Sequence, residues 1–345
     1  MLSRTHVAPR PVILVAPASF KGTLSAREAA AAIARGARRA CPGEEVVQLP
    51  VADGGEGTLD ALGLPTRTVR VRGAWRARRD ARVGVDGDAW VIELAQICGW
   101  PPGDAMTAST RGVGEALRIG LDAGVRRFRV CLGGSVTTDA GAGLLLGLGG
   151  ALLDARGLPL MPGGDELRRL REVVLPDLHG ARIDVACDVQ ARFLQAANVY
   201  ARQKGASGVQ VLLLEAGLRR FAEVTGLVDQ PGAGAAGGTA AALLLLGATL
   251  HPGAAWVLDA VGFDAQLARA RIVVTGEGRV DAQTAQGKAP MEVVRRAQAR
   301  GVPVVMLAGA VEEAVAGVPT FALEPGGSAA AALEEAAARA SRIKS

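Results

Sequence analysis

Lysine is rare in this chain, and three of its lysines stand beside glycine. Only four of the 39 Lys and Arg residues are lysines, and Lys344 belongs to the terminal tail. The others are Lys21 in SFKG, Lys204 in RQKGA and Lys288 in QGKA. The lysine ammonium is a mobile point charge with three donors, so it suits phosphate in a way that the rigid arginine fork does not. The pattern therefore predicts that these three lysines bind phosphate.

Two acidic residues share a glycine-rich turn in VADGGEGT, residues 51–58. Glycines allow so tight a turn, and they bring Asp53 and Glu56 close together on it. Two carboxylates in this arrangement can hold Mg²⁺ or accept hydrogen bonds from substrate hydroxyls. The alternative is that Asp53 only caps a helix that begins near Thr58. Because a cap needs one carboxylate and the turn offers two, we favour the functional site.

Two further glycine-rich stretches each lead into an apolar helix. In LGGSVTTDAGAG, residues 132–143, successive backbone amides and a helix N-terminus are expected to form an anion-binding nest with nearby hydroxyls. The residues expected to contact the anion are Gly133, Gly134, Ser135 and Thr138. The alternative there is a tight turn without a ligand. For PGAGAAGGTAAALLLL, residues 231–246, a phosphate cradle and close helix packing explain the pattern equally well.

The segment VTGEGRVDAQTAQGKAP, residues 274–290, is the richest in polar groups. It follows the apolar strand ARIVV and carries both signs of charge among three glycines. Polar loops at the carboxyl end of a strand commonly form binding sites, so a glycine-rich functional loop is expected here. Its candidate residues are Gly276, Glu277, Arg279, Asp281 and Lys288.

The stretch ACDV, residues 186–189, ends another strand with Asp188, and Lys204 follows shortly after it. An acidic residue that accepts a proton, near a cation that holds phosphate, is the minimum requirement for phosphoryl transfer. Taken singly, each remains an ordinary residue at the end of a strand. The hypothesis of phosphoryl transfer therefore depends on all of these segments together.

Hydrophobic periodicity predicts the elements that position these segments. The continuous apolar run in PVILVAPASF predicts a strand buried on both faces of a parallel sheet. Ser25 as N-cap, with Glu28 three residues later, predicts a capped helix, and EEVVQLPVAD predicts the next strand. Residues 12–52 are therefore expected to form a β-α-β unit. Its first turn, SFKGTLS from Ser19 onward, lies where such sheets bind ligands.

The two ends of the chain resemble each other, and the middle differs. Near the C-terminus, ARIVVTGEGRVD, APMEVVRRAQARG and VPVVMLAGA repeat the alternation of strand and helix, whereas TRTVRVRGAW and ARVGVDGDAWVIELA predict an antiparallel hairpin. We therefore expect an α/β fold, with a Rossmann-like parallel-sheet domain built from residues 1–64 and 255–345 and an inserted α/β (α+β) domain at 65–254. Residues 107–150 are compatible with either domain, and the active site is expected in the cleft between the two.

Composition argues against several other classes of protein. The formal charge is +5, but the basic residues are interleaved with acidic ones and only 3% of the residues are aromatic, so no nucleic-acid partner is expected. The four cysteines form no CxxC pair, which argues against structural zinc and for reduced core thiols. No signal-peptide pattern and no run of ~20 apolar residues is present. We expect a cytoplasmic monomer or homodimer that has a small-molecule substrate and no membrane partner.

Eight of these stretches resemble, in order, the motifs of the bacterial two-domain glycerate kinases across nearly the whole chain. They are SFKGTLSA, PVADGGEGT, TASTRGVGEAL, LGGSVTTDAGAG, ACDV, QKGAS, PGAGAAGG and VTGEGRVDAQTAQGKAP. The resemblance implies ATP-dependent phosphorylation of D-glycerate at the 2-hydroxyl, with ATP and Mg²⁺ required. It also implies a fold of one Rossmann-like domain and one distinct α/β domain.

The candidate residues take distinct roles under this kinase hypothesis. Lys21 and Lys288 are expected to act in catalysis by neutralising phosphate charge, and Asp188 by orienting or deprotonating the glycerate hydroxyl. The expected metal ligands are Asp53, Glu56 and Asp281. The expected substrate and phosphate ligands are Ser19, Gly133, Gly134, Ser135, Thr138, Lys204, Gly276, Glu277 and Arg279.

Two departures from the family pattern motivate a second hypothesis. Ala18 stands where the family usually has an aspartate before Ser-Phe-Lys-Gly. The segment 190–203 is shorter than usual and lacks an Asn-Pro-Leu stretch. The second hypothesis is a degenerate family member that binds a nucleotide or a small hydroxy acid with little or no kinase activity.

Overall fold

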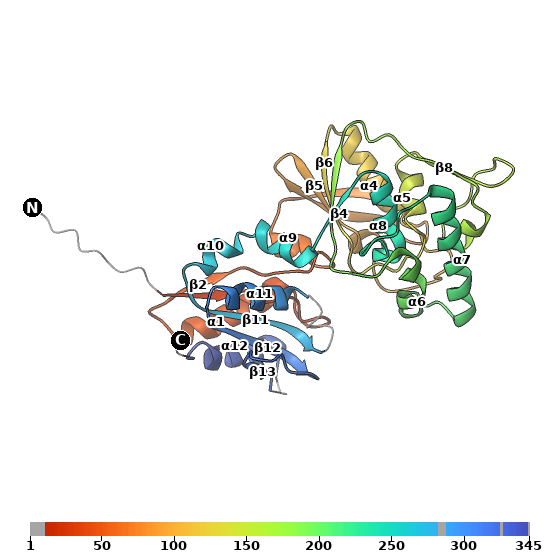
Figure 1. The fold of residues 1–345 in the computed structure, drawn as a ribbon. Helices are drawn as coiled ribbons and strands as arrows, with labels where there is room; N and C mark the ends of the chain where they lie inside the picture. The colour runs from red at the N-terminus through yellow and green to blue at the C-terminus, as the bar shows by residue number, and fades with distance from the viewer. Residues whose placement is uncertain (1–10, 282–287, 325–326, 344–345) are drawn as a thin grey trace, which may run out of the picture. The chain divides into compact units, whose positions relative to one another are not determined.

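The chain forms two compact units. The computed structural model describes residues 11–281, 288–324 and 327–343 (Figure 1). Unit 1 comprises Met1–Ala52, Asp60–Leu62 and Val257–Ser345. Unit 2 comprises Asp53–Leu59 and Gly63–Trp256. Each unit is built around a sheet of its own, and parallel strands and helices together make this an α/β protein, as predicted.

Unit 1 contains a parallel five-stranded sheet with the order β13-β12-β11-β1-β2. Its strands are β1 (Val12–Val15), β2 (Glu45–Gln48), β11 (Ala270–Val280), β12 (Val304–Val311) and β13 (Thr320–Ala322). Every residue of β1 is fully buried, as its continuous apolar run predicts for a central strand. The chain order reverses between β1 and β11, and parallel sheets bind ligands beyond the carboxyl ends of strands at such a point.

Helices α1 (Ala26–Ala40) and α12 (Ala329–Ala340) pack against each other beside this sheet. The predicted capping box at the start of α1 is confirmed. The Ser25 hydroxyl accepts from the Glu28 amide at 3.2 Å, and the Glu28 carboxylate accepts from the Ser25 amide at 2.8 Å. Helices α10 (Phe263–Leu267) and α11 (Ala289–Ala299) contact β11.

The predicted loop after the strand ARIVV is wrong in its first part. Strand β11 continues through Val280, because it pairs with β12 from Val273↔Val304 to Val280↔Val311. Glycine makes this pairing possible, since a Cβ on Gly276 would lie 2.2 Å from the Leu307 carbonyl oxygen. Residues 282–287 of the predicted loop lie outside the described residues.

Unit 2 contains a mixed six-stranded sheet with the order β10-β9-β6-β5-β4-β3. Its strands are β3 (Thr66–Arg72), β4 (Arg78–Asp86), β5 (Ala89–Glu93), β6 (Arg127–Cys131), β9 (Arg182–Ala186) and β10 (Thr249–His251). Strands β5, β6, β9 and β10 are parallel. Strand β4 runs antiparallel to β3 and β5, which confirms the predicted hairpin at the Asp-Gly-Asp turn.

The helices of unit 2 surround one large apolar core. They are α2 (Thr58–Leu62, shared with unit 1), α3 (Ala95–Cys98), α4 (Arg111–Asp122), α5 (Ala142–Gly147), α6 (Ala196–Tyr200), α7 (Gly208–Thr225), α8 (Ala235–Leu245) and the start of α9 (Gly253–Ala260). A small sheet pairs β7 (Ala151–Leu153) with β8 (Glu172–Val174). No helix among the described residues is long and apolar enough to cross a membrane.

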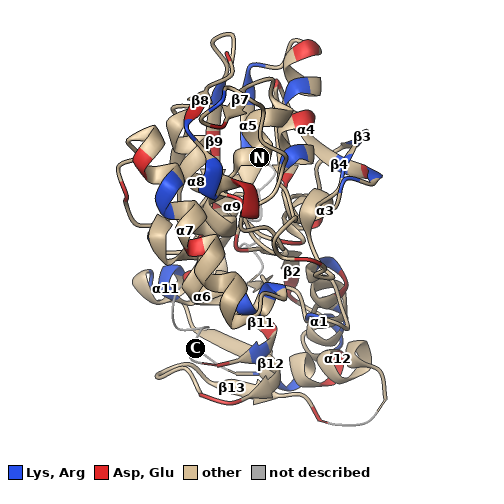
Figure 2. Ribbon diagram, turned by 90° about the vertical axis from the view of Figure 1, so that its right-hand side faces the viewer, with Lys and Arg blue, Asp and Glu red and all other residues tan. Residues whose placement is uncertain are grey.

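Charge of both signs is distributed over the helices and strands of each unit. Figure 2 shows basic and acidic residues interspersed along the ribbon. Many of them form ion pairs, such as Arg35 with Glu334 and Arg118 with Asp122. The excess of arginine therefore serves mainly surface ion pairing, which contributes little to stability for each pair.

The contact between α1 and α12 depends on Gly36. A Cβ at this position would lie 2.0 Å from the Glu334 carbonyl oxygen, so the two helices must separate when one is added. Gly36→Ala is expected to lower the free energy of unfolding by about 1–3 kcal/mol, in spite of its gain in helix propensity. Urea denaturation measures this loss.

Gly43→Ala is the matched control, because nothing lies within 4 Å of a Cβ at that position. It is expected to change the free energy of unfolding by about 0.5 kcal/mol or less. Equal unfolding midpoints for the two variants would contradict the expectation that the close contact between α1 and α12 excludes a side chain at position 36.

Candidate active site

The carboxyl ends of four parallel strands in unit 2 lie in one row. The residues that pair across this row are Glu93 of β5, Cys131 of β6, Ala186 of β9 and His251 of β10. The segments that follow these strands therefore leave the sheet at the same edge. Three of them are the turn Gly133–Ser135, the residue Asp188 and the pair Gly253–Ala254. The sequence predicted the first two as functional.

The turn at residues 53–57 packs directly on the Gly133–Ser135 turn. A Cβ on Gly133 would lie 2.2 Å from the Gly55 Cα atom, so the two backbones touch where neither residue has a side chain. Gly54 adopts a left-handed φ of +77° and lies against Ala186. Close to Gly134, the Glu56 carboxylate extends from the first turn toward the second. Two predicted sites are therefore a single cluster in unit 2.

Glu93, and not Asp53, accepts hydrogen bonds from the backbone amides at the start of α2. The Glu93 side chain is 1% exposed and accepts hydrogen bonds from the amides of Gly57 at 2.9 Å and Leu59 at 3.0 Å. The Asp53 carboxylate accepts from the Gly55 amide at 3.1 Å. The interpretation of Asp53 as the cap of this helix is therefore wrong. A single acid within the apolar run WVIEL is the sequence signal that marks Glu93.

Asp53 and Glu56 are the two carboxylates of this cluster that could hold a magnesium ion. Asp53 is half-buried and Glu56 is exposed, and both belong to the turn that touches Gly133. Among the described residues, no group of three or more acidic, histidine or cysteine side chains forms a complete metal cage. Mg²⁺ typically binds to one or two carboxylates and to substrate phosphates, so two carboxylates are a sufficient protein contribution.

Asp188 caps a helix in this structure. Its carboxylate accepts from the amides of Gly253 at 2.8 Å and Ala254 at 2.9 Å, at the start of α9. A Cβ on Gly253 would lie 2.2 Å from the Asp53 carbonyl oxygen, so this helix start lies against the acidic turn. Asp188 therefore fixes the α9 terminus next to Asp53, and both of its oxygens accept backbone hydrogen bonds.

Lys204 lies beneath the Gly133–Ser135 turn and not on the surface. It is 5% exposed, and its Nζ donates to the Ser135 hydroxyl at 3.1 Å and to the Thr137 carbonyl at 2.6 Å. Direct phosphate binding by Lys204, as the sequence predicted, does not agree with this burial. Thr138 is also buried, and its hydroxyl has no hydrogen-bond partner among the described residues. Lys204 therefore supports the turn from within.

Asp139 is a buried acid that the sequence analysis missed. Its carboxylate accepts from the amide and hydroxyl of Thr110 and from the amides of Gly141 and Gly143. Burial raises the pKa of Asp139, and these hydrogen bonds oppose that shift. Asp139 thereby joins the N-terminal ends of α4 and α5 to the segment that follows the Gly133–Ser135 turn.

For the segment 231–246, close packing is the better of the two interpretations. Residues Ala235–Leu243 are buried. A Cβ on Gly237 would lie 2.1 Å from the Thr137 carbonyl oxygen, and the Gly237 carbonyl accepts from the Ala140 amide at 3.0 Å. Left-handed backbone at Ala236–Gly238 creates this approach, so the glycines allow α8 to reach the back of the 133–140 segment.

In unit 1, the ends of β1 and β11 bring the predicted residues together. The Ala18 amide donates to the Gly276 carbonyl at 2.9 Å, and a Cβ on Gly278 would lie 3.1 Å from the Lys21 amide nitrogen. Ser19 is half-buried and Lys21 is exposed in this turn. The two stretches that the sequence marked in this unit, ASFKG and TGEGR, are therefore in backbone contact.

Lys288 joins two carboxylates in unit 1. It is the N-cap residue of α11, and its Nζ lies 3.6 Å from the Glu277 carboxylate and 3.5 Å from the Asp281 carboxylate. Arg279 instead forms an exposed ion pair with Glu312 at 2.9 Å. Three predicted site residues therefore form one cluster, and the guanidinium of Arg279 extends toward a different partner.

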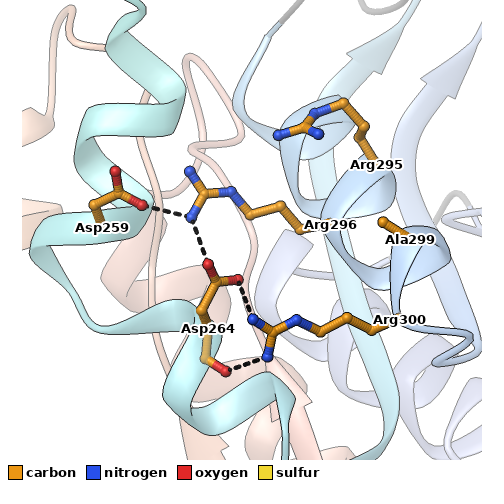
Figure 3. A pocket seen from close by; sticks show the side chains of 6 residues that line it. All are labelled: Asp259, Asp264, Arg295, Arg296, Ala299 and Arg300. Carbon is orange, nitrogen blue, oxygen red and sulfur yellow. Dashed lines mark hydrogen bonds and ion pairs between the residues drawn. The ribbon is translucent and has the colours of Figure 1, made fainter.

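An ion-pair network holds the far half of α11. Arg296 is 11% exposed in its side chain and pairs with Asp259 at 2.6 Å, Asp264 at 3.3 Å and Glu292 at 2.8 Å. Figure 3 shows Arg296 and Arg300 extending from α11 toward Asp259 and Asp264 in the pocket that these residues line. The acids at this pocket form ion pairs with the arginines. These ion pairs fix α11, the helix that carries Lys288.

The contact of Gly133 with Gly55 generates a prediction. Gly133→Ala forces two backbone segments apart and is expected to lower the free energy of unfolding by about 2 kcal/mol or more. Hydrogen exchange is expected to show lost protection at the amides of Gly57 and Leu59, because the 53–57 turn must move. Denaturation and exchange are measured on the same samples.

The matched control is Gly208→Ala at the start of α7, where the nearest atom to an added Cβ is the Arg202 side chain at 3.6 Å. This change is expected to leave stability and exchange nearly unchanged. Unaltered exchange at Gly57 and Leu59 in Gly133→Ala would contradict the contact.

Comparisons with known proteins point to one family. The model of the glycerate kinase family matches residues 13–342. A glycerate kinase of Bacillus subtilis is 40% identical over 324 residues, covering 87% of this chain and 85% of its own, and the glycerate 2-kinase of Escherichia coli is 36% identical over 328 residues, covering 88% and 86%. A crystal structure from Salmonella typhimurium LT2, assigned as glycerate kinase 2, aligns with a TM-score of 0.83 and 35% identity over 96% of this chain and 97% of that one. The chain therefore belongs to the glycerate kinase family, a family of kinase enzymes.

Proposed function

We propose that this protein transfers a phosphoryl group from ATP to D-glycerate and forms 2-phosphoglycerate. Family membership supports phosphorylation of glycerate, and the relative in Escherichia coli is named a glycerate 2-kinase. The observation that carries the proposal is the contact of the acidic 53–57 turn with the Gly133–Ser135 turn at the carboxyl edge of the unit 2 sheet. A glycine turn that binds anions and two carboxylates that bind magnesium are the parts that phosphoryl transfer requires.

In this proposal, each unit carries groups that fit phosphate. Unit 1 has the ammonium groups of Lys21 and Lys288, and unit 2 has the backbone amides of the Gly133–Ser135 turn. The Lys288 ammonium has carboxylate neighbours in Glu277 and Asp281, which hold it in place. Phosphoryl transfer depends mainly on positioning and charge stabilisation, so such fixed donors are the main protein contribution.

Asp53 and Glu56 are the proposed magnesium ligands, with Asp281 as a further candidate. When bound, Mg²⁺ supplies positive charge that neutralises phosphate oxygens. Asp188 is assigned an indirect role, because its carboxylate accepts from two backbone amides at the start of α9. It keeps that helix start, and with it the Asp53 backbone, in position.

The alternative of a degenerate, non-catalytic member is less well supported. Its first motive is Ala18, but the same end of the unit 1 sheet keeps the acids Glu277 and Asp281 together with Lys288. Its second motive is the short 190–203 segment. That segment forms the 3₁₀ turn Phe193–Gln195 and helix α6, and it leads directly to the buried Lys204. Neither departure removes a group on which the proposed transfer depends.

An assay of ADP release with D-glycerate, ATP and Mg²⁺ tests the proposal. Lys288→Ala is expected to lower kcat by on the order of 10²-fold, because a cation that stabilises the transferred phosphoryl group is lost. Arg39→Ala is the control, since it removes an exposed cation of the same unit that pairs with Glu334 and Glu335, and its kcat is expected to stay within about twofold.

Turnover by the unmodified protein that is no faster than that of Lys288→Ala would exclude kinase activity toward D-glycerate. Turnover with other small hydroxy acids and none with D-glycerate would assign a different acceptor.

A further inference from the structure

The ammonium of Lys204 reaches the Gly133–Ser135 turn from the interior of unit 2. The 3₁₀ turn Arg202–Lys204 carries it, and Gly205 ends that turn with a left-handed φ of +94°. The two hydrogen bonds of its Nζ go to the Ser135 hydroxyl at 3.1 Å and to the Thr137 carbonyl at 2.6 Å. With 5% of its surface exposed, Lys204 acts on any ligand only through these two partners.

The direction of the bond to Ser135 is fixed by chemistry. A lysine ammonium has three donors and no acceptor, so the Ser135 oxygen must accept from it. A serine hydroxyl carries one proton of its own, which must then be donated to a third group. Within the described part of the chain, the bond from Lys204 is the single hydrogen bond of the Ser135 hydroxyl. Ser135 is itself 7% exposed, but it stands next to the exposed Gly134 at the surface of the turn, so its proton can be donated to a ligand that binds there.

We propose that Lys204 is a positioning residue that turns the Ser135 hydroxyl into a hydrogen-bond donor for an oxyanion of a substrate. This inference rests on the proposed kinase function, since the oxyanion belongs either to a nucleotide phosphate or to the carboxylate of the hydroxy acid. Both share the same chemistry, a negatively charged oxygen that accepts a short hydrogen bond. The Thr137 carbonyl, held by the same ammonium, fixes the other end of the turn.

The charge of Lys204 is sensitive to pH. Burial lowers its pKa to about 8, and the nearby groups Cys98 and Asp139 oppose this shift. Burial also raises the pKa of Cys98, and the Asp139 carboxylate accepts four hydrogen bonds. Once the pH rises above about 8, the amine becomes neutral and can accept a hydrogen bond from the Ser135 hydroxyl. The Ser135 hydroxyl then no longer has to donate its hydrogen bond to a ligand.

A double-mutant cycle tests the inference. The variants are Lys204→Met, Ser135→Ala and the double variant, and KM is measured for ATP and for D-glycerate with the other substrate at saturation. Each single variant is expected to raise one of these KM values by on the order of 10- to 100-fold, the effect of losing a hydrogen bond to a charged group. The double variant is expected to be no worse than the weaker-binding single variant, because both remove the same bond.

The KM that rises identifies the source of the oxyanion. A rise for ATP assigns a phosphate, and a rise for D-glycerate assigns the carboxylate. Ser341→Ala is the matched control, because it removes a buried hydroxyl of unit 1 that lacks a hydrogen-bond partner in the described chain. It is expected to leave both KM values unchanged. Multiplicative effects of the two changes, or unchanged KM values in Ser135→Ala, would overturn the inference.

A pH series tests the inference without the Lys204→Met variant, so it also applies if that variant does not fold. In the unmodified protein the affected KM is expected to rise as the pH increases through about 8, where Lys204 loses its proton. In Ser135→Ala this rise is expected to disappear, because no hydroxyl remains to change direction. The same pH dependence in both proteins would contradict a role through Ser135.

Absence of turnover in the unmodified protein would refute the proposed function and not this inference. Calorimetric titration of ATP and of D-glycerate into the same variants then measures the affinity directly. An affinity that falls in both Ser135→Ala and Lys204→Met supports the inference, and affinities equal to that of the unmodified protein exclude it.

Discussion

Two glycines that touch without side chains set the geometry of unit 2. Gly55 and Gly133 come from segments far apart in the sequence, and their backbones approach so closely that a single methyl group on Gly133 would separate them. The contact lies beyond the row of strand ends that β5, β6 and β9 form. Strand β6 leads into the Gly133 segment at this edge, and the two glycines allow the 53–57 turn to pack directly against it.

Buried polar groups support this cluster from below. Glu93 accepts hydrogen bonds from the start of α2, and Asp139 accepts them from the starts of α4 and α5. Lys204 donates a hydrogen bond to the Gly133–Ser135 turn. Each buried charge has hydrogen-bond partners, which burial demands, because an unpaired charge in the interior is strongly destabilising. Such networks fix one arrangement of the backbone, and phosphoryl transfer requires that its donors be fixed in advance.

Local signals in the sequence predicted much of the fold. The apolar run of β1, the Ser25 and Glu28 capping box and the Asp-Gly-Asp hairpin each depend on neighbouring residues, and all three are confirmed. The length of β11 was not predictable in the same way, because it depends on five further residue pairs with β12 beyond ARIVV. Long-range pairing overrides local composition where a partner strand is available.

The candidate site shows the same division between local and long-range information. Glycine and charge marked segments that the structure brings into contact within each unit, since those features are local. Which acid caps α2 depended on Glu93, a residue more than thirty positions away along the chain. The scarcity of lysine likewise drew attention to Lys204, but only the tertiary structure shows that its ammonium faces the interior.

Phosphorus-31 NMR of a reaction with ATP, Mg²⁺ and D-glycerate is the most direct measurement of the proposed chemistry. We predict a new phosphate monoester resonance, coupled to the single proton of carbon 2, that grows as ATP is converted to ADP. A monoester coupled to the two protons of carbon 3, or no monoester at all, would contradict the proposal that this protein phosphorylates the 2-hydroxyl of D-glycerate.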